Sequence, residues 1–190
     1  MSVEEKIIYF DSPGPQNTDA TLRAALERAK ERGIKYVVVA STTGETGVKA
    51  VDMFKDSGIK VVVVTHQYGF LKPGEIALKK EFADEITKKG GTLVIGTDVF
   101  TMVPRAFRER GGDPIDIVNA TLRMFCQGMK VCVEIVLMAV AAGAIPSNTD
   151  VIAIAGTRRG ADTAVMIKST DISRMFSDLK IREIIAMPRK

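Results

Sequence analysis

The stretch Tyr36-Val37-Val38-Val39-Ala40-Ser41-Thr42-Thr43-Gly44-Glu45-Thr46-Gly47 joins an apolar run to a short loop built from Ser, Thr and Gly. An uninterrupted apolar run is typical of a central parallel strand buried on both faces. A second stretch repeats the pattern: residues 151–155 read VIAIA and residues 156–163 read GTRRGADT. Loops of this kind, leaving a buried strand, present backbone N–H groups and hydroxyls to phosphate. The pair predicts an anion site.

Strand-like and helix-like segments alternate along the rest of the chain, which indicates a parallel sheet covered by helices. Strands are predicted over 6–10, 36–40, 60–65, 92–96, 151–155, 164–168 and 181–186. Helices are predicted over 18–30, 46–57, 73–89 and 113–143, the last with a bend or a break at Gln127-Gly128, and near Ser173. No linker or repeat is visible. We therefore expect one α/β domain spanning residues 1–190, with three layers in the order α/β/α.

The strand order follows from the connections. Strands 36–40, 61–65 and 92–96 should lie side by side, because right-handed helical crossovers join them. The long helix can then carry the chain back, so that strand 151–155 pairs on the other side of strand 36–40. Strand 164–168 follows so closely that only an antiparallel hairpin fits. With 36–40 as strand 1, the predicted central order is 3-2-1-4-5, and ligands bind at such a reversal of order.

Each loop has an ordinary interpretation beside the functional one. In the first, Ser41, Thr42, Thr43 and Thr46 offer hydroxyls, and the helix that follows directs its N-terminal N–H groups at the same place; alternatively, these residues only cap that helix. In the second, the Arg158-Arg159 pair can bind phosphate in a fork geometry, and Asp162 can accept from a sugar hydroxyl or cap the backbone. Alternatively, this loop is a hairpin with solvated arginines. Neither a Walker motif nor GxGxxG is present.

His66 is the only histidine and stands at the end of a central strand. We expect it to hydrogen-bond a ligand rather than act as a general base, since nothing in the sequence orients it; simple loop packing is the alternative. One His without clustered Cys argues against a metal site. Cys126 and Cys132 fit reduced, buried thiols. Lys130 and Glu134 fit a buried structural ion pair, and Gly128 would let a flat ring approach its helix.

Composition limits the classes of partner. The net charge is +4 and the charged residues are scattered, which does not favour a nucleic-acid partner. The first residues contain no apolar segment of a signal peptide. The most apolar stretch, 131–145, is shorter than the ~20 residues that span a bilayer. We therefore expect a cytoplasmic protein with no membrane partner, and the long apolar helix and the edge strands suggest a homo-oligomer.

Several segments together resemble a known family of small archaeal and bacterial proteins with the fold of the pyruvate kinase C-terminal domain. They are 13–22, 37–46, 62–66, 127–135, 156–164 and 181–188. Pyruvate kinases place a regulatory sugar phosphate in the loop matching 41–46, and the stand-alone family is similar to flavin mononucleotide (FMN) binders. Arg158-Arg159 departs from a more usual Gly-Arg. The kinase barrel is absent from these residues, so we expect no phosphoryl transfer from phosphoenolpyruvate.

The combined expectation is a protein that binds FMN or a similar phosphorylated small molecule, with flavin-dependent redox chemistry as one outcome. A non-catalytic sensor of a sugar phosphate or nucleotide is the alternative, and the sequence does not decide whether catalysis occurs. No metal ligands are predicted. The predicted binding residues are Ser41, Thr42, Thr43, Gly44, Glu45, Thr46, His66, Gln127, Gly128, Gly156, Thr157, Arg158, Gly160 and Asp162.

Overall fold

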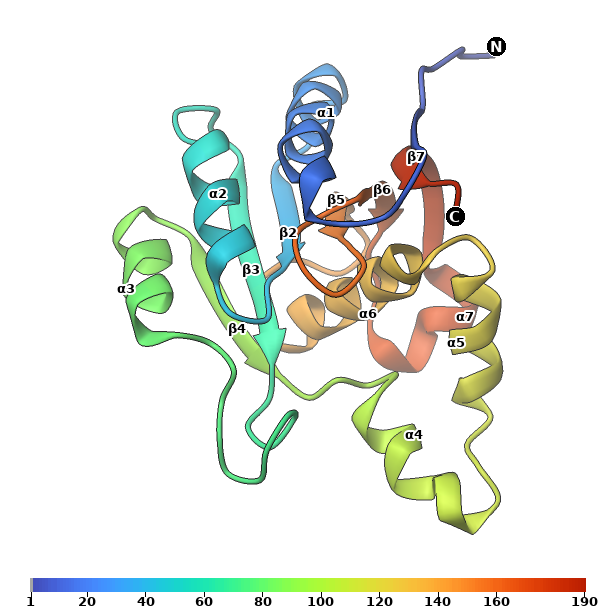
Figure 1. Cartoon of the computed structure of the whole chain (residues 1–190). Helices are drawn as coiled ribbons and strands as arrows, with labels where there is room; N and C mark the ends of the chain where they lie inside the picture. The colour runs from blue at the N-terminus through green and yellow to red at the C-terminus, as the bar shows by residue number, and fades with distance from the viewer. Residues whose placement is uncertain (1) are drawn as a thin grey trace.

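A seven-stranded, mostly parallel sheet forms the centre of the computed structural model, which describes residues 2–190 (Figure 1). The sheet order is β1-β7-β6-β5-β2-β3-β4. The strands are β1 (Ile8–Phe10), β2 (Tyr36–Ala40), β3 (Lys60–His66), β4 (Thr92–Gly96), β5 (Asp150–Ala155), β6 (Thr163–Lys168) and β7 (Lys180–Pro188). The helices are α1 (Thr18–Glu31), α2 (Glu45–Met53), α3 (Lys80–Lys88), α4 (Met102–Phe107), α5 (Ile115–Arg123), α6 (Gln127–Ala141) and α7 (Met175–Asp178).

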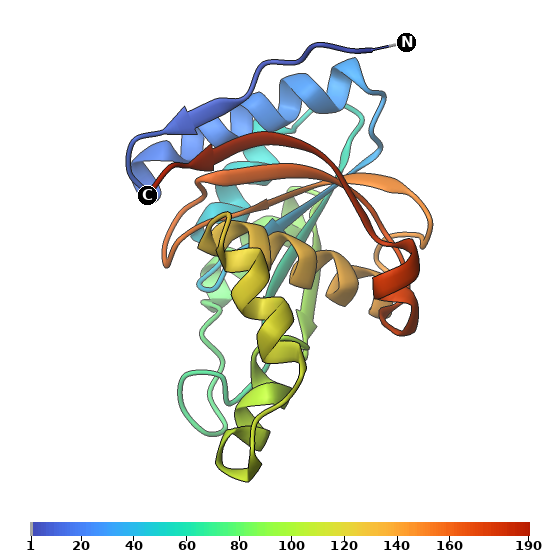
Figure 2. The ribbon, with the colours of Figure 1, turned by 90° about the vertical axis from the view of Figure 1, so that its right-hand side faces the viewer.

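Helices cover both faces of the sheet and make two separate cores. One core packs the apolar face of α6 against the sheet and includes Met129, Val136 and Leu137. The other lies on the opposite face under α1, α2 and α3, and includes Leu22, Ala50 and Ile86. Figure 2 shows α1 on one side of the strands and α5 and α6 on the other. This is the predicted α/β/α layering.

The predicted central order is confirmed. β4, β3, β2 and β5 are parallel neighbours, and β6 pairs antiparallel with β5, with Ile152 opposite Met166. No position in the sheet was predicted for β1 and β7. β7 pairs antiparallel with β6, and β1 pairs parallel with β7, so the first and last strands of the chain meet at one edge. β5 therefore lies in the middle of the sheet, with β2 beside it.

Two helix predictions were wrong in extent. The predicted helix over 73–89 begins only at Lys80, because Gly74 has a φ of 75° and forms a turn in which the Glu75 N–H bonds to Lys72. The predicted long helix over 113–143, for which a bend or break was expected at Gln127-Gly128, is two helices, and the break lies just before Gln127. Cys126 is extended there, and its Sγ accepts the Met129 N–H at the start of α6. The helix α4 was not predicted at all.

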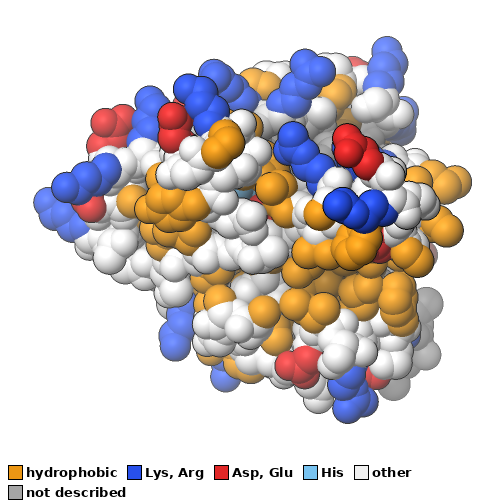
Figure 3. All heavy atoms as spheres, turned by 90° about the horizontal axis from the view of Figure 1, so that it is seen from below, with side chains coloured by type: hydrophobic (Ala, Val, Ile, Leu, Met, Phe, Trp, Pro, Cys, Tyr) orange, Lys and Arg blue, Asp and Glu red, His pale blue; other side chains and the backbone are white. Residues whose placement is uncertain are grey.

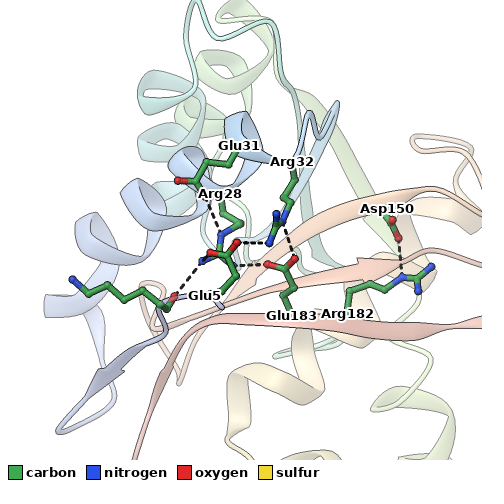
Figure 4. A network of polar contacts seen from close by, with 8 residues as sticks. Glu5, Arg28, Glu31, Arg32, Asp150, Arg182 and Glu183 are labelled. Carbon is green, nitrogen blue, oxygen red and sulfur yellow. Dashed lines mark hydrogen bonds and ion pairs between the residues drawn. The ribbon is translucent and has the colours of Figure 1, made fainter. Parts of the chain in front are cut away.

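A network of ion pairs fastens the N-terminal segment to the β7 edge (Figure 4). The nearly buried guanidinium of Arg28 on α1 bonds to Glu183 on β7, and its Nη2 lies 3.1 Å from Glu5 Oε2. Arg32 Nε lies 2.9 Å from Glu183 Oε1, and Arg32 also pairs with Glu5. The two arginines thus hold one carboxylate from each end of the chain.

Candidate functional site

A cavity of about 570 Å³ opens at the carboxyl ends of β2, β3 and β5, where the strand order reverses. Both polar loops line it: the first through Ser41, Thr42, Thr43, Glu45 and Thr46, the second through Gly156, Arg158, Arg159 and Gly160. His66 and Gln127 line it as well. The two loops, far apart in sequence, therefore meet at one cavity, as expected from the reversal of strand order.

The first loop forms the start of α2. Gly44 has a φ of 103°, and a Cβ there would come within 2.4 Å of Phe82 Cβ, so this turn requires glycine. Ser41 Oγ accepts the Gly47 N–H at 3.1 Å in the first turn of α2, and its own hydroxyl proton is not used by this bond. Within residues 2–190, the N–H groups of Thr43, Gly44, Glu45 and Thr46 have no protein acceptor. Free N–H groups at the positive end of a helix dipole are the donors that anion sites use.

The second loop holds Arg158 in an unusual backbone conformation. Its φ is 67°, in the left-handed region that favours glycine. The loop is tightly packed, since a Cβ on Gly156 would lie 2.7 Å from the Gly160 carbonyl oxygen. Strain of this kind persists where the surroundings hold it, and it clusters at ligand sites.

Four predicted residues do not line the cavity: Gly44, Gly128, Thr157 and Asp162. Asp162 is fully buried, and its Oδ2 accepts the N–H groups of Gly14 at 3.0 Å and Thr157 at 3.1 Å. Its predicted bond to a sugar hydroxyl is replaced by the capping alternative. Gly128 packs against Thr163 rather than facing the cavity, so its lack of a side chain serves helix–strand packing.

His66 has an orienting partner that the sequence did not reveal. Its Nδ1 lies 2.6 Å from Oδ1 of Asp98, a buried carboxylate two residues beyond β4. The Phe70 ring stacks on the imidazole at 3.5 Å with an interplanar angle of 2°. The expectation that nothing orients His66 was wrong. The sequence did place both residues at neighbouring strand ends, since His66 ends one strand and Asp98 follows the next. No rule of sequence spacing, however, predicts a contact between them.

Lys130 and Glu134 form the expected buried ion pair, and both line the cavity. Lys130 Nζ also donates to Thr101 Oγ1 at 2.6 Å, while Glu134 Oε1 accepts the Phe100 N–H at 2.7 Å. Burial lowers the pKa of Lys130, although Glu134 opposes the shift. The pair therefore fixes the loop before α4 against α6, besides placing a cation in the cavity wall.

Further charged groups at the cavity were not among the predicted binding residues. Lys79 lies just before α3, and Arg123 ends α5, where its Nε donates to Gln127 Oε1 at 2.7 Å. Apolar walls complete the cavity; they are Val64, Phe70, Leu71, Phe82, Val131, Ile135 and Met138. A lining that combines arginine, lysine and free N–H groups with apolar surface suits a ligand with an anionic group and an apolar body.

Two features are absent from residues 2–190. No cluster of three His, Cys, Asp or Glu side chains there could hold a metal ion. In the same range, no helix combines the length and hydrophobicity that crossing a bilayer requires.

A family model described as "Pyruvate kinase, alpha/beta domain" matches residues 19–168, which is most of the chain. The chain belongs to this family. Two solved structures of relatives come from Cryptosporidium parvum. One pyruvate kinase is 13% identical over 80% of this chain and 22% of its own, with a TM-score of 0.43; the same organism's enzyme in complex with ADP is 15% identical over 90% and 24%, with a TM-score of 0.38. The chain spans about a quarter of those pyruvate kinases.

The family match covers both polar loops and the strands that carry them, from β2 through β6. The resemblance to the pyruvate kinase C-terminal domain is thereby confirmed. The match ends before β7 and begins after β1, the two edge strands that the ion network holds together.

Proposed function

We propose that the cavity binds a phosphorylated small molecule, with the phosphate against the loop of residues 41–47. The observation that carries the proposal is the meeting of this loop with Arg158 and Arg159 at one cavity. Four N–H groups without protein acceptors at the start of α2 supply neutral donors, and the arginines supply charge. Charge-assisted bonds of this type are the strong ones in phosphate recognition.

FMN is the first ligand we propose. Besides a phosphate it has a flat, largely apolar ring, and the cavity offers apolar walls such as Phe70, Phe82 and Met138 next to the anion site. A volume of about 570 Å³ lies within the usual range of small-molecule sites. Bound FMN would supply redox chemistry, and the residues of this chain would bind and orient it. The residues present fit the group.

Flavin binding is tested by titrating the purified protein with FMN and following flavin fluorescence. Riboflavin is the matched ligand, because it lacks only the phosphate, and we expect it to bind at least about tenfold more weakly, since a charged hydrogen bond contributes about 1.5–3 kcal/mol. Arg158→Ala should weaken FMN binding by a similar factor. Arg23→Ala, an exposed arginine on α1 outside the cavity, is the control and should bind as wild type.

The second candidate function is a sensor that binds a sugar phosphate without catalysis. The observation that favours the sensor is the proposed phosphate site, because phosphate binding there does not require a flavin ring. A colourless protein that takes up no added FMN, but whose melting temperature rises with sugar phosphates, would replace the flavin proposal by this one. A protein that responds to neither ligand would reject both.

We also infer a cytoplasmic, self-associating protein. Large apolar side chains are exposed on α4, α5 and the residue pair that follows α5: Val103, Phe107, Ile117, Met124 and Phe125. Seen from below, the molecule shows broad areas of hydrophobic atoms between separate Lys and Arg side chains (Figure 3). Apolar patches of this kind commonly mark protein interfaces. Sedimentation equilibrium tests self-association, and a monomer at all concentrations would contradict it.

A further inference from the structure

We propose that His66 transfers protons to and from a hydroxyl group of the phosphorylated ligand, with Asp98 as its positioning residue. This inference depends on the proposed function in one respect only, that the ligand carries a phosphate. Its structural basis is the contact of 2.6 Å between His66 Nδ1 and Asp98 Oδ1. The two residues come from neighbouring parallel strands, since His66 is paired with Gly96 and Asp98 follows two residues later.

The contact selects one form of the imidazole ring. A carboxylate oxygen only accepts hydrogen bonds, so Nδ1 carries the proton and Nε2 keeps its lone pair. Within residues 2–190, no protein group bonds to Nε2, while a quarter of the His66 side chain is exposed and the ring lines the cavity. Phe70 stacked on the ring fixes its plane. His66 therefore presents a base to the cavity in a fixed orientation.

A second observation distinguishes Asp98 from a purely structural carboxylate. Asp98 Oδ2 is buried and has no hydrogen-bond partner among the described residues, although Asp98 is 2% exposed and lines the cavity. Buried carboxylate oxygens are normally paired, because leaving one unpaired is costly. A purely structural Asp98 would have both oxygens bound within the protein, as Asp162 has. Within residues 2–190, Asp98 instead leaves Oδ2 unpaired and enclosed in the protein, while Oδ1 bonds to the imidazole.

The surrounding charges are mixed in sign. The charged groups that line the cavity are Glu45, Lys79, Asp98, Arg123, Lys130, Glu134, Arg158 and Arg159. Glu134 is already paired with Lys130. Only Asp98 contacts the imidazole directly. It is therefore the group that stabilises the imidazolium when His66 takes up a proton.

The step is a reversible proton transfer. The O–H bond of the ligand breaks, its proton forms a bond to Nε2, and the electron pair remains on the ligand oxygen. The imidazolium then donates from Nδ1 to Asp98 and from Nε2 back to the oxygen in the reverse direction. The role resembles that of any general base held by a carboxylate.

The single histidine makes the test unambiguous. Diethylpyrocarbonate acylates an unprotonated imidazole nitrogen, and its absorbance change reports His66 alone. In the native protein we expect one rapidly modified histidine and none in His66→Gln. Asp98→Asn should react at least about tenfold more slowly, because an amide N–H bonded to Nδ1 moves the proton to Nε2. Asp84→Asn, an exposed aspartate on α3, is the control and should react as wild type.

Two results would overturn the inference: a histidine that reacts only after unfolding, or an Asp98→Asn protein that folds and reacts at the wild-type rate. If Asp98→Asn does not fold, ¹⁵N chemical shifts of the wild-type histidine decide, and a proton on Nε2 at neutral pH rejects the inference. Saturating inorganic phosphate or FMN should slow the modification of wild type. Failure of the FMN titration with His66 still reactive and dependent on Asp98 would reject the flavin and leave this inference standing.

Discussion

Gly128 on α6 and Thr163 on β6 are packed so closely that a Cβ on Gly128 would lie 2.1 Å from Thr163 Oγ1 and 2.5 Å from Thr163 Cβ. The same Thr163 hydroxyl lies 3.3 Å from Cys126 Sγ, the cap of α6. The start of α6, which carries Gln127 and Lys130 to the cavity, is therefore positioned by direct contact with the sheet. The absence of one side chain sets the distance between helix and strand.

Replacing Gly128 by Ala should destabilise the protein. The added methyl group must displace Thr163 or α6, and overpacking of this kind costs about 1–3 kcal/mol. The free energy of unfolding from urea titration measures the loss. Gly96→Ala is the matched control, because its nearest contact would be the flexible end of Met138 at 3.3 Å. An equally stable Gly128→Ala protein would contradict the packing argument.

Arg158 offers a test of backbone strain with the charge held constant between two variants. Arg158→Gly and Arg158→Ala both remove the guanidinium, but only Gly adopts a φ of 67° without steric cost. We expect the Gly variant to be the more stable of the two by about 1 kcal/mol, while both lose affinity for phosphate equally. Thermal unfolding measures the first and FMN titration the second. Equal melting temperatures would show that the loop relaxes without strain.

The buried Lys130–Glu134 pair should show strong energetic coupling. Lys130→Met leaves the Glu134 carboxylate buried without its cation, which costs about 3–5 kcal/mol. Replacing both residues by apolar ones removes both charges, so the double variant should lose less than the sum of the single variants. A double-mutant cycle measured by urea unfolding gives the coupling. Additive losses would mean that solvent or neighbouring groups compensate each charge separately.

The two cysteines should be unreactive in the folded protein. Burial raises the pKa of Cys126 and raises that of Cys132 well above its ordinary value, so neither presents a thiolate at pH 8. Ellman's reagent should label native protein at least about 100-fold more slowly than denatured protein, since labelling requires opening. Rapid reaction of one thiol would show that the start of α6 opens readily.

The same shifts predict how stability depends on pH. A thiol whose pKa is raised on folding holds its proton while the unfolded chain loses it, so the unfolding free energy falls as pH rises above about 9.0. Below that pH the contribution is fully present. Cys132→Ala should show a smaller fall between pH 8 and 10.5 than wild type does. An identical fall in both proteins would assign the pH dependence to other groups.

The sequence predicted the parts of this molecule that depend on uniform local patterns. Apolar runs such as 36–40 and 151–155 have one plausible place, the centre of the sheet, and the rule for crossovers then gives the order of five strands. The prediction of helix bounds failed at the starts of α3 and α6, because the helical pattern of the sequence continues through Gly74 and Phe125. The turn at Gly74 and the cap by Cys126 override that periodicity. A cysteine is not an expected helix cap.

The candidate site was predictable where a residue's type and its place at a strand end agree, as for Thr43, Thr46, His66 and Arg158. Asp98, Lys79 and Arg123 were missed because their place depends on how irregular segments cross the mouth of the cavity. Asp162 and Gly128 are residue types that often occur in ligand sites, yet here they serve the packing of the protein. Sequence alone does not tell a buried carboxylate that caps two loops from one that faces a ligand.

The pairing of β1 with β7 at the far edge of the sheet has a consequence for biosynthesis. β1 is synthesised long before β7, the strand with which it pairs, so residues 8–10 stay without this neighbour while the segment between them is made. Arg28 and Arg32 likewise lack their ion-pair partner Glu183 until β7 has been synthesised. The nascent chain can assemble β2 to β5 beforehand, and pairing at the β1 edge is then a late event that follows the synthesis of β7.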